Sequence, residues 1–323
     1  MRGLLVGNFG VGNLGDEALR QYFLERFPEI SWIVVSASPS SSNEVPRLPT
    51  GIRSFFTSWW RTLGAYRSCD AVVFGGGSLL TDTESSFACF LWGWHARIAQ
   101  FFGKPILLAF QGIGPFRTKR GEQWAQRVVA CSSFVSVRDI ASKRRIERWS
   151  LNRKVVQSFD PVFSLLSAYK MPNSTKNVLA IFPRNSYDTN LVLRLRQVLQ
   201  SRAPEEILFV LMQPSSERPI VARIQKETSV QGSVLEVTSL AQLQEALGSV
   251  SRVISQRYHG AIAALAAGKE VMIIPQIRGD KLDELQGMLQ RGVQSEDLLN
   301  QVEIGESVLR KTLNAIASAK EGA

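Results

Sequence analysis

The segment from residue 253 to residue 285 constrains the fold more strongly than any other part of the chain. It reads as a short buried strand (253–255), a polar turn, a helix of small residues (260–267) and a second buried strand (271–275). Parallel strands need a crossover connection, so this pattern is typical of a strand–helix–strand unit in a parallel sheet. The helix, AIAALAAG, has little side-chain bulk and can therefore pack close to that sheet.

Arg257 and His259 lie in the polar turn of this unit. The first N–H groups of a helix have no partner within the helix, and its N-terminus attracts negative charge. A cation beside those groups makes the turn a candidate anion site. The alternative is an ordinary polar turn that only links the strand to the helix.

The same alternation of strand, loop and helix recurs along the whole chain. In the first half, polar or glycine-rich loops follow the expected strands at 3–6, 32–36, 71–74, 105–110, 134–137 and 155–157. A second series begins at 178–182 and continues at 207–212 and 234–237. This alternation is the signature of doubly wound parallel sheets, which bind ligands at the carboxyl ends of their strands.

The segment 168–177 is the best candidate for a linker, and 323 residues are enough for two domains. We therefore expect an α/β chain with two Rossmann-like domains that face a central cleft, the GT-B-like architecture. The expected domains are residues 1–170 and residues 171–323.

The N-terminal loop contains the pattern G-x-G-x-x-G between Gly10 and Gly15. Asp16 and Glu17 follow at once and place negative charge where a dinucleotide pyrophosphate would bind, which argues against a dinucleotide fingerprint. What remains is a loop whose backbone approaches another group closely, with Asn13 and Asp16 as polar side chains. Asp16 has a structural alternative, because an aspartate at this point can simply cap its helix.

Three consecutive glycines, Gly75, Gly76 and Gly77, follow the expected strand 71–74. Glycines at the carboxyl end of a strand let a ligand approach the backbone, so this loop suits a ligand crevice in an open parallel sheet.

The net charge of +10 suits a nucleic acid, an anionic membrane surface or a phosphorylated small substrate. No nucleic-acid-binding motif accompanies the positive residues, so we do not expect a nucleic acid partner.

The three cysteines form no CxxC pair, which fits a reducing compartment. No apolar run approaches the roughly 20 residues of a membrane span. We expect a cytoplasmic protein.

With these elements in place, the sequence resembles the polysaccharide pyruvyl transferase family. The matching motifs, in chain order, are GNFGVGNLGDEA (7–18), GGGSLL (75–80), QGIGP (111–115), SVRD (136–139), DP (160–161), RYHG (257–260) and DK (280–281). The resemblance implies a GT-B-type fold and transfer of pyruvate from phosphoenolpyruvate to a sugar as a cyclic ketal. It also implies that the sugar belongs to a cell-surface polysaccharide or its lipid-linked precursor.

In that family the arginine–histidine turn is implicated in phosphoenolpyruvate binding, which places the donor on residues 171–323 and the acceptor on residues 1–170. This chain has Tyr258 where the family often has leucine, and we expect the tyrosine to pack without changing the chemistry.

Phosphoenolpyruvate carries a carboxylate and a phosphate and needs several fixed cations, and arginine recognises both groups with paired hydrogen bonds. Arg138, Arg257 and Lys281 lie at expected strand-to-helix junctions, and Arg184 is a fourth candidate. For Lys281 the alternative is a solvated helix start. The expected substrate-binding residues are Arg138, Arg257, Tyr258, Lys281, Arg184, Asn13, Gly76 and Gly77.

Ketal formation needs a group that moves protons near neutral pH, and His259 is the candidate for this acid/base role. Asp16 or Asp139 is its candidate partner, although Asp139 can equally be the N-cap of the helix that follows. The sequence has no His/Cys cluster and no DxD motif, so we expect catalysis by positive side chains with no metal or other cofactor. Phosphoenolpyruvate is then a co-substrate.

Two rival functions stay open. A glycosyltransferase that uses a nucleotide sugar can have the same fold. A non-catalytic basic module at a membrane or polysaccharide would keep its function after His259→Ala. Acceptor contacts are expected from the serine- and proline-rich connection 38–58 and from the tryptophans at 59–60 and 92–94. A basic protein also suits peripheral contact with the anionic inner face of a membrane.

Overall fold

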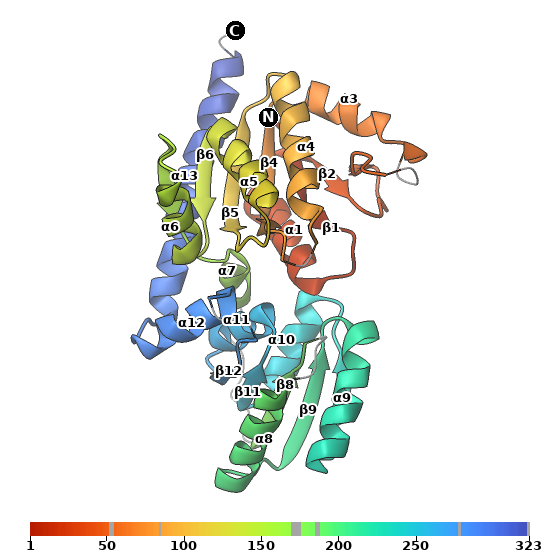
Figure 1. Ribbon diagram of the computed structural model, residues 1–323, viewed down its shortest axis with the longest axis vertical. Coiled ribbons are helices and arrows are strands. Elements are labelled where there is room, and N and C mark those ends of the chain that lie inside the picture. Colours follow the sequence, from red (N-terminus) through yellow and green to blue (C-terminus); the bar gives the residue numbers. More distant parts are fainter. Residues whose placement is uncertain (52–54, 84, 169–175, 185–187, 277–278, 322–323) are drawn as a thin grey trace. The chain divides into compact units, whose positions relative to one another are not determined.

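The computed structural model describes residues 1–51, 55–83, 85–168, 176–184, 188–276 and 279–321 (Figure 1). The chain forms two compact units. Unit 1 comprises Met1–Val11, Leu19–Pro161 and Leu299–Ala323, and unit 2 comprises Gly12–Ala18 and Val162–Leu298. The boundary expected between residues 170 and 171 lies outside the described residues. The last helix, expected in the second domain, joins unit 1 from Leu299 onward.

Unit 1 is built on a sheet of seven strands, in the order β3-β2-β1-β4-β5-β6-β7. All neighbouring strands pair in parallel. The strands are β1 (Arg2–Phe9), β2 (Ser31–Ser36), β3 (Glu44–Pro46), β4 (Ala71–Leu80), β5 (Ile106–Ile113), β6 (Phe134–Val137) and β7 (Val155–Gln157). The chain runs outward from β1 to β3 and then returns to β4 on the other side of β1, which is the doubly wound pattern.

Three strands, β1, β4 and β5, extend beyond their expected carboxyl ends, and one strand, β3, is additional. β4 continues through the three glycines, because Gly75 pairs with Ala109 and Gly77 with Gln111 of β5. Gly76 and Gly77 have φ of 78° and 82°, a conformation that favours glycine, and the register shifts directly after them. β3 pairs with β2 within the segment expected to be a connection.

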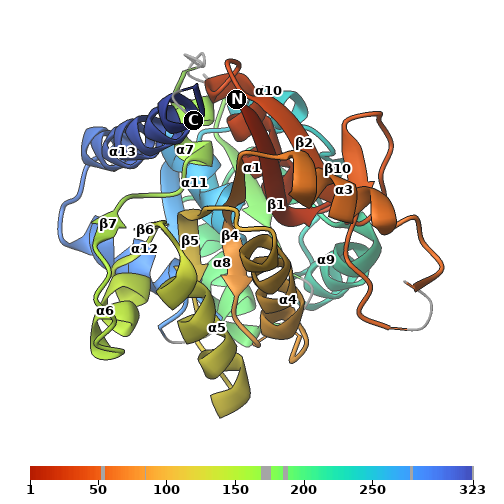
Figure 2. The same cartoon turned by 90° about the horizontal axis from the view of Figure 1, so that it is seen from above.

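Helices cover both faces of this sheet. They are α1 (Leu14–Arg26, whose first turn belongs to unit 2), α3 (Trp60–Ser68), α4 (Ala88–Phe101), α5 (Lys119–Cys131), α6 (Ile140–Arg148) and α13 (Ser295–Glu321). Within unit 1, Figure 2 shows α1 and α13 on one side of the sheet and α4 and α5 on the other. Tyr22 of α1 packs edge-on against Phe110 with ring centroids 5.6 Å apart and donates a hydrogen bond of 2.9 Å to Glu306 of α13.

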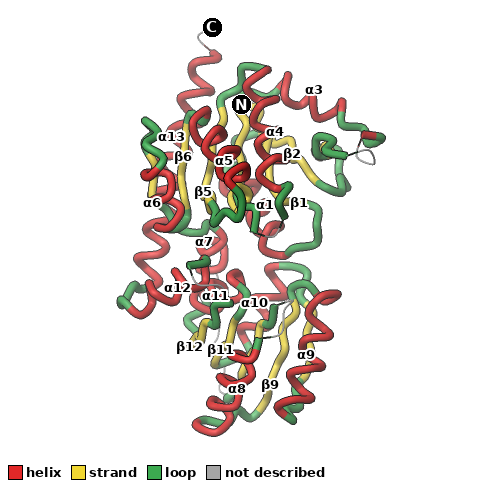
Figure 3. The backbone as a smooth tube through the Cα atoms, in the orientation of Figure 1, coloured by secondary structure: helices red, strands yellow, loops and turns green. Residues whose placement is uncertain are grey.

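Unit 2 has a parallel sheet of five strands, in the order β10-β9-β8-β11-β12. The strands are β8 (Val178–Phe182), β9 (Glu206–Leu211), β10 (Ser233–Glu236), β11 (Arg252–Ser255) and β12 (Glu270–Ile273). The helices are α7 (Val162–Ser167), α8 (Thr189–Ser201), α9 (Pro214–Thr228), α10 (Leu240–Gly248), α11 (Tyr258–Ala266) and α12 (Lys281–Gln290), and Figure 3 shows them around the sheet. The α/β prediction with two Rossmann-like sheets is confirmed.

The small residues of α11 allow it to lie directly on the sheet, as the sequence predicts. A Cβ added to Gly260 would lie 2.8 Å from the ring of Phe182 on β8, so a larger residue would push the helix away. The helix begins two residues earlier than expected, at Tyr258. Among the residues that the structure describes, no helix has the length and hydrophobicity needed to cross a membrane.

His95 is completely buried in unit 1. The Leu48 backbone N–H donates to its Nε2 at 3.3 Å, so Nδ1 carries the proton and donates to the Tyr66 hydroxyl at 2.7 Å. Burial, and secondarily the charge of Arg47, lowers the pKa of His95 to about 3. The imidazole is therefore held as one neutral tautomer.

This burial predicts a pH-dependent stability. In the unfolded chain the histidine binds a proton below a pKa of about 6.5, whereas in the folded protein it resists protonation down to about 3. The free energy of unfolding should therefore fall as the pH drops from about 6.5 towards 3, with a contribution from this site of up to about 1.4 kcal/mol per pH unit. Urea unfolding across that range should show a shallower slope for His95→Gln than for the wild type. Equal slopes would contradict the assignment.

Candidate functional site

The candidate site lies at the carboxyl edge of the sheet in unit 2, between β8 and β11. The strand order reverses there, and ligands of open parallel sheets bind at such switch points. Phe182, the last residue of β8, pairs with Ser255, the last residue of β11. Arg184 and Arg257 each follow two residues later, so the structure brings these two predicted cations to the same edge.

Arg257 is held in place by its own turn and by α9. Its backbone N–H donates to Ser255 Oγ at 3.1 Å, and that hydroxyl donates to the Arg257 carbonyl at 2.7 Å. The guanidinium Nε donates to Glu217 Oε1 at 2.5 Å, and Nη2 donates to Gln213 Oε1 at 2.9 Å and also pairs with Glu217. The side chain stays 16% exposed. It is thus a fixed cation that solvent still reaches.

Glu217, which holds Arg257 in place, is a residue of the candidate site that the sequence analysis missed. Its side chain is completely buried, and its second oxygen, Oε2, accepts from the backbone N–H groups of Met212 and Gln213 at 2.8 Å each. The carboxylate is therefore anchored at the end of β9 and presents its other oxygen to Arg257. The sequence feature that could have identified Glu217 is its position as an acidic residue in the first turn of α9, the helix that follows β9.

The first turn of α11 has no side-chain cap. Its N-cap residue is Arg257, whose side chain makes no capping hydrogen bond. Among the described residues, side-chain oxygens cap α5, α6, α8, α10 and α12, from Thr118, Asp139, Asp188, Ser239 and Asp280, whereas α3, α4 and α9, like α11, have no side-chain cap. A helix that starts at a cation in place of an acceptor suits an anion supplied by a ligand.

Gly15, the last glycine of the N-terminal motif, packs against His259, and both residues belong to unit 2. A Cβ added to Gly15 would lie 2.0 Å from Nδ1 and 2.2 Å from Cε1 of His259, so any other residue would displace the imidazole. Asn13 Oδ1 accepts from the Gly15 N–H at 3.1 Å, and Asn13 Nδ2 donates to Asp16 Oδ2 at 2.9 Å. The predicted residues Asn13 and Asp16 thus flank Gly15, the residue that contacts the histidine.

Tyr258 and Lys281 complete this group. Tyr258 is buried, which confirms the expectation that it packs, and its ring stands nearly perpendicular to that of His259 at a centroid distance of 5.5 Å. The Lys281 ammonium lies 5.0 Å from the centre of the Tyr258 ring, a cation–π contact. Lys281 is also the first residue of α12, which Asp280 caps. The tyrosine therefore connects the histidine to a second cation.

The remaining predicted residues, Gly76, Gly77, Arg138 and Asp139, belong to unit 1. Arg138 is buried, forms an ion pair with the buried Asp160 and donates to Ser78 Oγ at 2.8 Å. The Asp139 carboxylate accepts from the Ser142 N–H at 2.6 Å and caps α6, which is the structural alternative considered for it. The predicted site residues thus form two separate groups, one in each unit.

The described part of the chain contains no cluster of three or more His, Cys, Asp or Glu side chains that could hold a metal ion. What unit 2 offers a ligand is a set of cations (Arg184, Arg257 and Lys281) together with an imidazole and a carboxylate (His259 and Asp16).

Solved structures with this architecture are GT-B-type enzymes. One is a glycosyltransferase from Rickettsia africae, with a TM-score of 0.60, 10% identity, and 100% of this chain and 99% of that chain covered. Another is the UDP-GlcNAc 2-epimerase of Neisseria meningitidis bound to UDP-GlcNAc, with a TM-score of 0.58, 13% identity, and 98% and 100% covered. A third is HepE of Anabaena in complex with UDP, with a TM-score of 0.56, 10% identity, and 99% and 100% covered. At these identities the likeness establishes the fold, so the chain is a GT-B-type α/β protein.

The model of the polysaccharide pyruvyl transferase family matches residues 13–276. The chain belongs to the polysaccharide pyruvyl transferase family. A comparison with curated protein sequences gave no match.

A double-mutant cycle tests the pairing of Arg257 with Glu217. Glu217→Gln leaves a largely buried guanidinium without its counter-charge, and Arg257→Gln leaves a fully buried carboxylate without its own, so each should lower the free energy of unfolding, by up to about 3 kcal/mol. The double variant should regain most of that loss. Urea unfolding measures all three proteins, and additive losses would contradict the pairing.

The matched control is the ion pair between Arg223 and Glu227 on the same helix, α9, whose side chains are 55% and 34% exposed. Glu227→Gln should change the free energy of unfolding by less than about 1 kcal/mol, because exposed pairs contribute little.

The contact between Gly15 and His259 predicts a specific NMR response. The chain has only two histidines, so protein labelled with ¹³C-histidine gives one signal from the buried His95 and one from His259. Gly15→Ala should shift the His259 signal and leave the His95 signal in place, because the added methyl group displaces the ring of His259 and not that of His95. Gly64→Ala, at a helical position with open space around it, is the control and should shift neither signal. An unchanged His259 signal in Gly15→Ala would refute the contact.

Proposed function

We propose that this protein transfers pyruvate from phosphoenolpyruvate to a sugar of a cell-surface polysaccharide, or of its lipid-linked precursor, as a cyclic ketal and releases phosphate. Family membership supports the reaction class. The observation that carries the proposal is the arrangement in unit 2, where Arg257 is fixed at the start of α11 and His259 follows it against Gly15. This places an anion-binding group and a proton-transfer group two residues apart.

The donor requires recognition of two anionic groups. Arg257 and the uncapped start of α11 supply a cation and a favourable helix dipole for one of them. Lys281 and Arg184 supply the charge for the other, since Lys281 reaches Tyr258 beside His259 and the Arg184 backbone lies 3.3 Å from Gln256 Oε1, next to Arg257. Several cations are needed because the Glu217 carboxylate already compensates part of the Arg257 charge.

The reaction balances with one proton donor and two sugar hydroxyls. A protonated His259 gives its proton to the methylene carbon of phosphoenolpyruvate, and the first hydroxyl adds to the neighbouring carbon. The enzyme takes up the proton of that hydroxyl. This proton replaces the one that His259 gave to the methylene carbon, which is now a methyl group. The second hydroxyl then displaces phosphate, which leaves with the second hydroxyl proton, and the ketal ring closes.

Of the two candidate partners for His259, the packing supports Asp16. Asp16 directly follows the glycine that contacts the imidazole, and Asn13 orients its carboxylate. The Asp139 carboxylate is engaged as the cap of α6. Asp16 is thus the group that accepts the hydroxyl proton and orients the histidine.

Phosphoenolpyruvate is a co-substrate in this proposal, and the reaction uses no other cofactor. The acceptor binds on the side of unit 1, and the protein works in the cytoplasm at the inner face of the membrane. A lipid-linked acceptor and the net charge of +10 favour that location.

A second candidate is glycosyl transfer from a nucleotide sugar. The specific observation in its favour is that structures with the same fold include complexes with UDP and UDP-GlcNAc. The two candidates differ in the ligand that should bind in unit 2, which makes them separable by one titration.

The deciding experiment follows the two histidine signals while phosphoenolpyruvate, UDP or a UDP-sugar is added. Phosphoenolpyruvate should shift the His259 signal saturably and leave His95 unchanged, because only His259 lies at the site. The double variant Arg257→Gln/Glu217→Gln, which keeps the buried charges balanced, should weaken that binding at least about a hundredfold. Arg194→Gln, an exposed change on α8, serves as the control and should bind normally.

Saturable binding of a UDP-sugar without any binding of phosphoenolpyruvate would reject pyruvyl transfer in favour of glycosyl transfer. Binding of neither ligand would reject both candidate uses of this site.

A further inference from the structure

Unit 1 presents aromatic side chains to solvent in a region that holds none of the groups proposed for donor binding or proton transfer. Among the described residues, the exposed large hydrophobic side chains include five aromatic ones, and all five lie between residues 55 and 101. They are Phe55, Phe56 (84% exposed), Trp60 (63%), Phe87 and Phe101 (81%). Single exposed apolar residues are ordinary, but a concentration of this kind marks an interaction surface.

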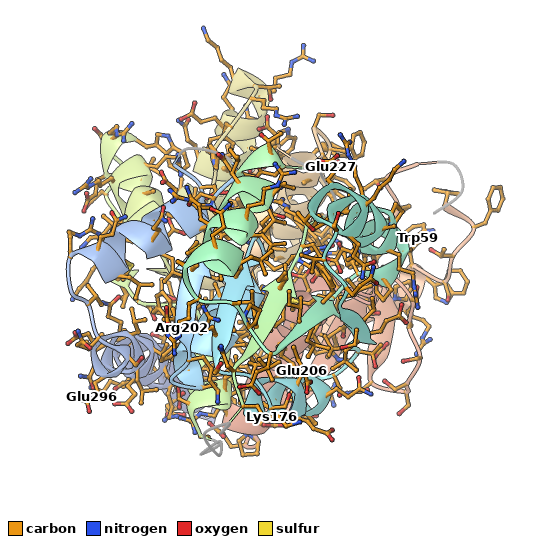
Figure 4. All side chains as sticks on the ribbon, turned by 90° about the horizontal axis from the view of Figure 1, so that it is seen from below. Trp59, Lys176, Arg202, Glu206, Glu227 and Glu296 are labelled. Atoms are coloured by element: carbon orange, nitrogen blue, oxygen red, sulfur yellow. The ribbon has the colours of Figure 1, made fainter. Side chains whose placement is uncertain are left out.

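An apolar groove of about 900 Å³ opens within this region. Its lining includes Phe55, Trp59, Phe90, Trp94 and Trp124, and its one charged residue among those described is Arg97. Trp59, labelled in Figure 4, lies at the outer edge of unit 1. Trp92, expected with the other tryptophans to contact an acceptor, is instead buried in the core of this unit.

Apolar residues also recur along one side of α4. Phe87 directly precedes the helix, and Phe90, Trp94, Ile98 and Phe101 follow at intervals of three or four residues, which places them on one side. Trp94 and Ile98 are partly buried against the core of unit 1, whereas Phe87 and Phe101 at the two ends of the series are exposed. We call these residues, together with the groove and Phe56 and Trp60, the aromatic surface.

The helices that carry the aromatic surface also carry positive charge. The helices α3, α4 and α5 carry six exposed cations, namely Arg61, Arg67, Arg97, Lys119, Arg120 and Arg127. Their one acidic residue, Glu122, accepts a hydrogen bond of 2.8 Å from Trp149 Nε1. The three helices are packed together, α4 being in contact with both α3 and α5. The partner of this surface must therefore be both apolar and negatively charged.

We propose that the aromatic surface docks unit 1 onto an anionic lipid bilayer. Tryptophan and phenylalanine insert at the level of the headgroups, and arginines beside them bind the phosphates. A second copy of this chain fits less well, because an isologous contact would bring the two sets of cations together. The groove then accommodates part of an acyl chain. This inference is independent of the proposed reaction, since membrane binding needs neither phosphoenolpyruvate nor a sugar.

The test is co-sedimentation of the full chain with vesicles, in the absence of substrates. Vesicles that contain equal amounts of phosphatidylglycerol and phosphatidylcholine should bind the wild type, and vesicles of phosphatidylcholine alone should bind it much more weakly. Phe56→Ser/Trp60→Ser should reduce binding at least about tenfold, because two exposed anchors are lost. The control Leu193→Ser/Ile304→Ser removes two other exposed apolar side chains, each 54% exposed, and should bind as the wild type does.

A second measurement uses the unmodified protein. Lipids brominated on their acyl chains should quench tryptophan fluorescence when the protein binds, because Trp59 and Trp60 then lie against the acyl chains. Absence of vesicle binding, or equal losses in the two double variants, would overturn the proposal. So would a dimer in light scattering that Phe56→Ser/Trp60→Ser dissociates, since the occupant would then be a second copy.

Discussion

The ion pair of Arg257 with the buried Glu217 is the interaction that fixes the candidate site of unit 2. A guanidinium at the start of a helix is electrostatically unfavourable, because both the cation and the helix N-terminus are positive. Glu217 offsets that cost from the neighbouring α9, and two backbone N–H groups hold its carboxylate in turn. The arginine is thereby fixed in a place where it would otherwise swing into solvent, and a bound anion meets a preorganised partner.

The glycines of the N-terminal motif act on the same site. Read alone, G-x-G-x-x-G suggests a phosphate loop, and the acidic residues behind it argue against that function. In the structure, Gly15 leaves room for the His259 ring, and Asn13 donates a hydrogen bond to the carboxylate of Asp16, the next residue after that glycine. A glycine can thus be required because it leaves space for a side chain of the same protein, and not only for a ligand.

Local sequence patterns predicted the fold well and the partners of the site residues poorly. The strands 134–137, 155–157 and 178–182 have the predicted bounds, because each is a short β-branched or aromatic run between clear breaks. The glycines after residue 74 looked like a loop, yet they continue β4 because β5 supplies hydrogen-bond partners. The placement of the last helix depends on contacts such as Tyr22 with Glu306, which no local pattern encodes.

Long-range pairing also separates two arginines that the sequence treats alike. Arg138 and Arg257 both follow a strand and both precede a helix, and each meets a buried carboxylate. Arg138, however, is only 1% exposed and has both Asp160 and Ser78 as partners, whereas Arg257 stays 16% exposed at a helix start with no side-chain cap. A buried arginine whose charge is compensated holds the surrounding loops in place. A partly exposed arginine can still attract an anionic ligand electrostatically. The difference depends on Asp160 and Glu217, residues 22 and 40 positions away in the chain, so only the folded structure can assign the two arginines to different roles.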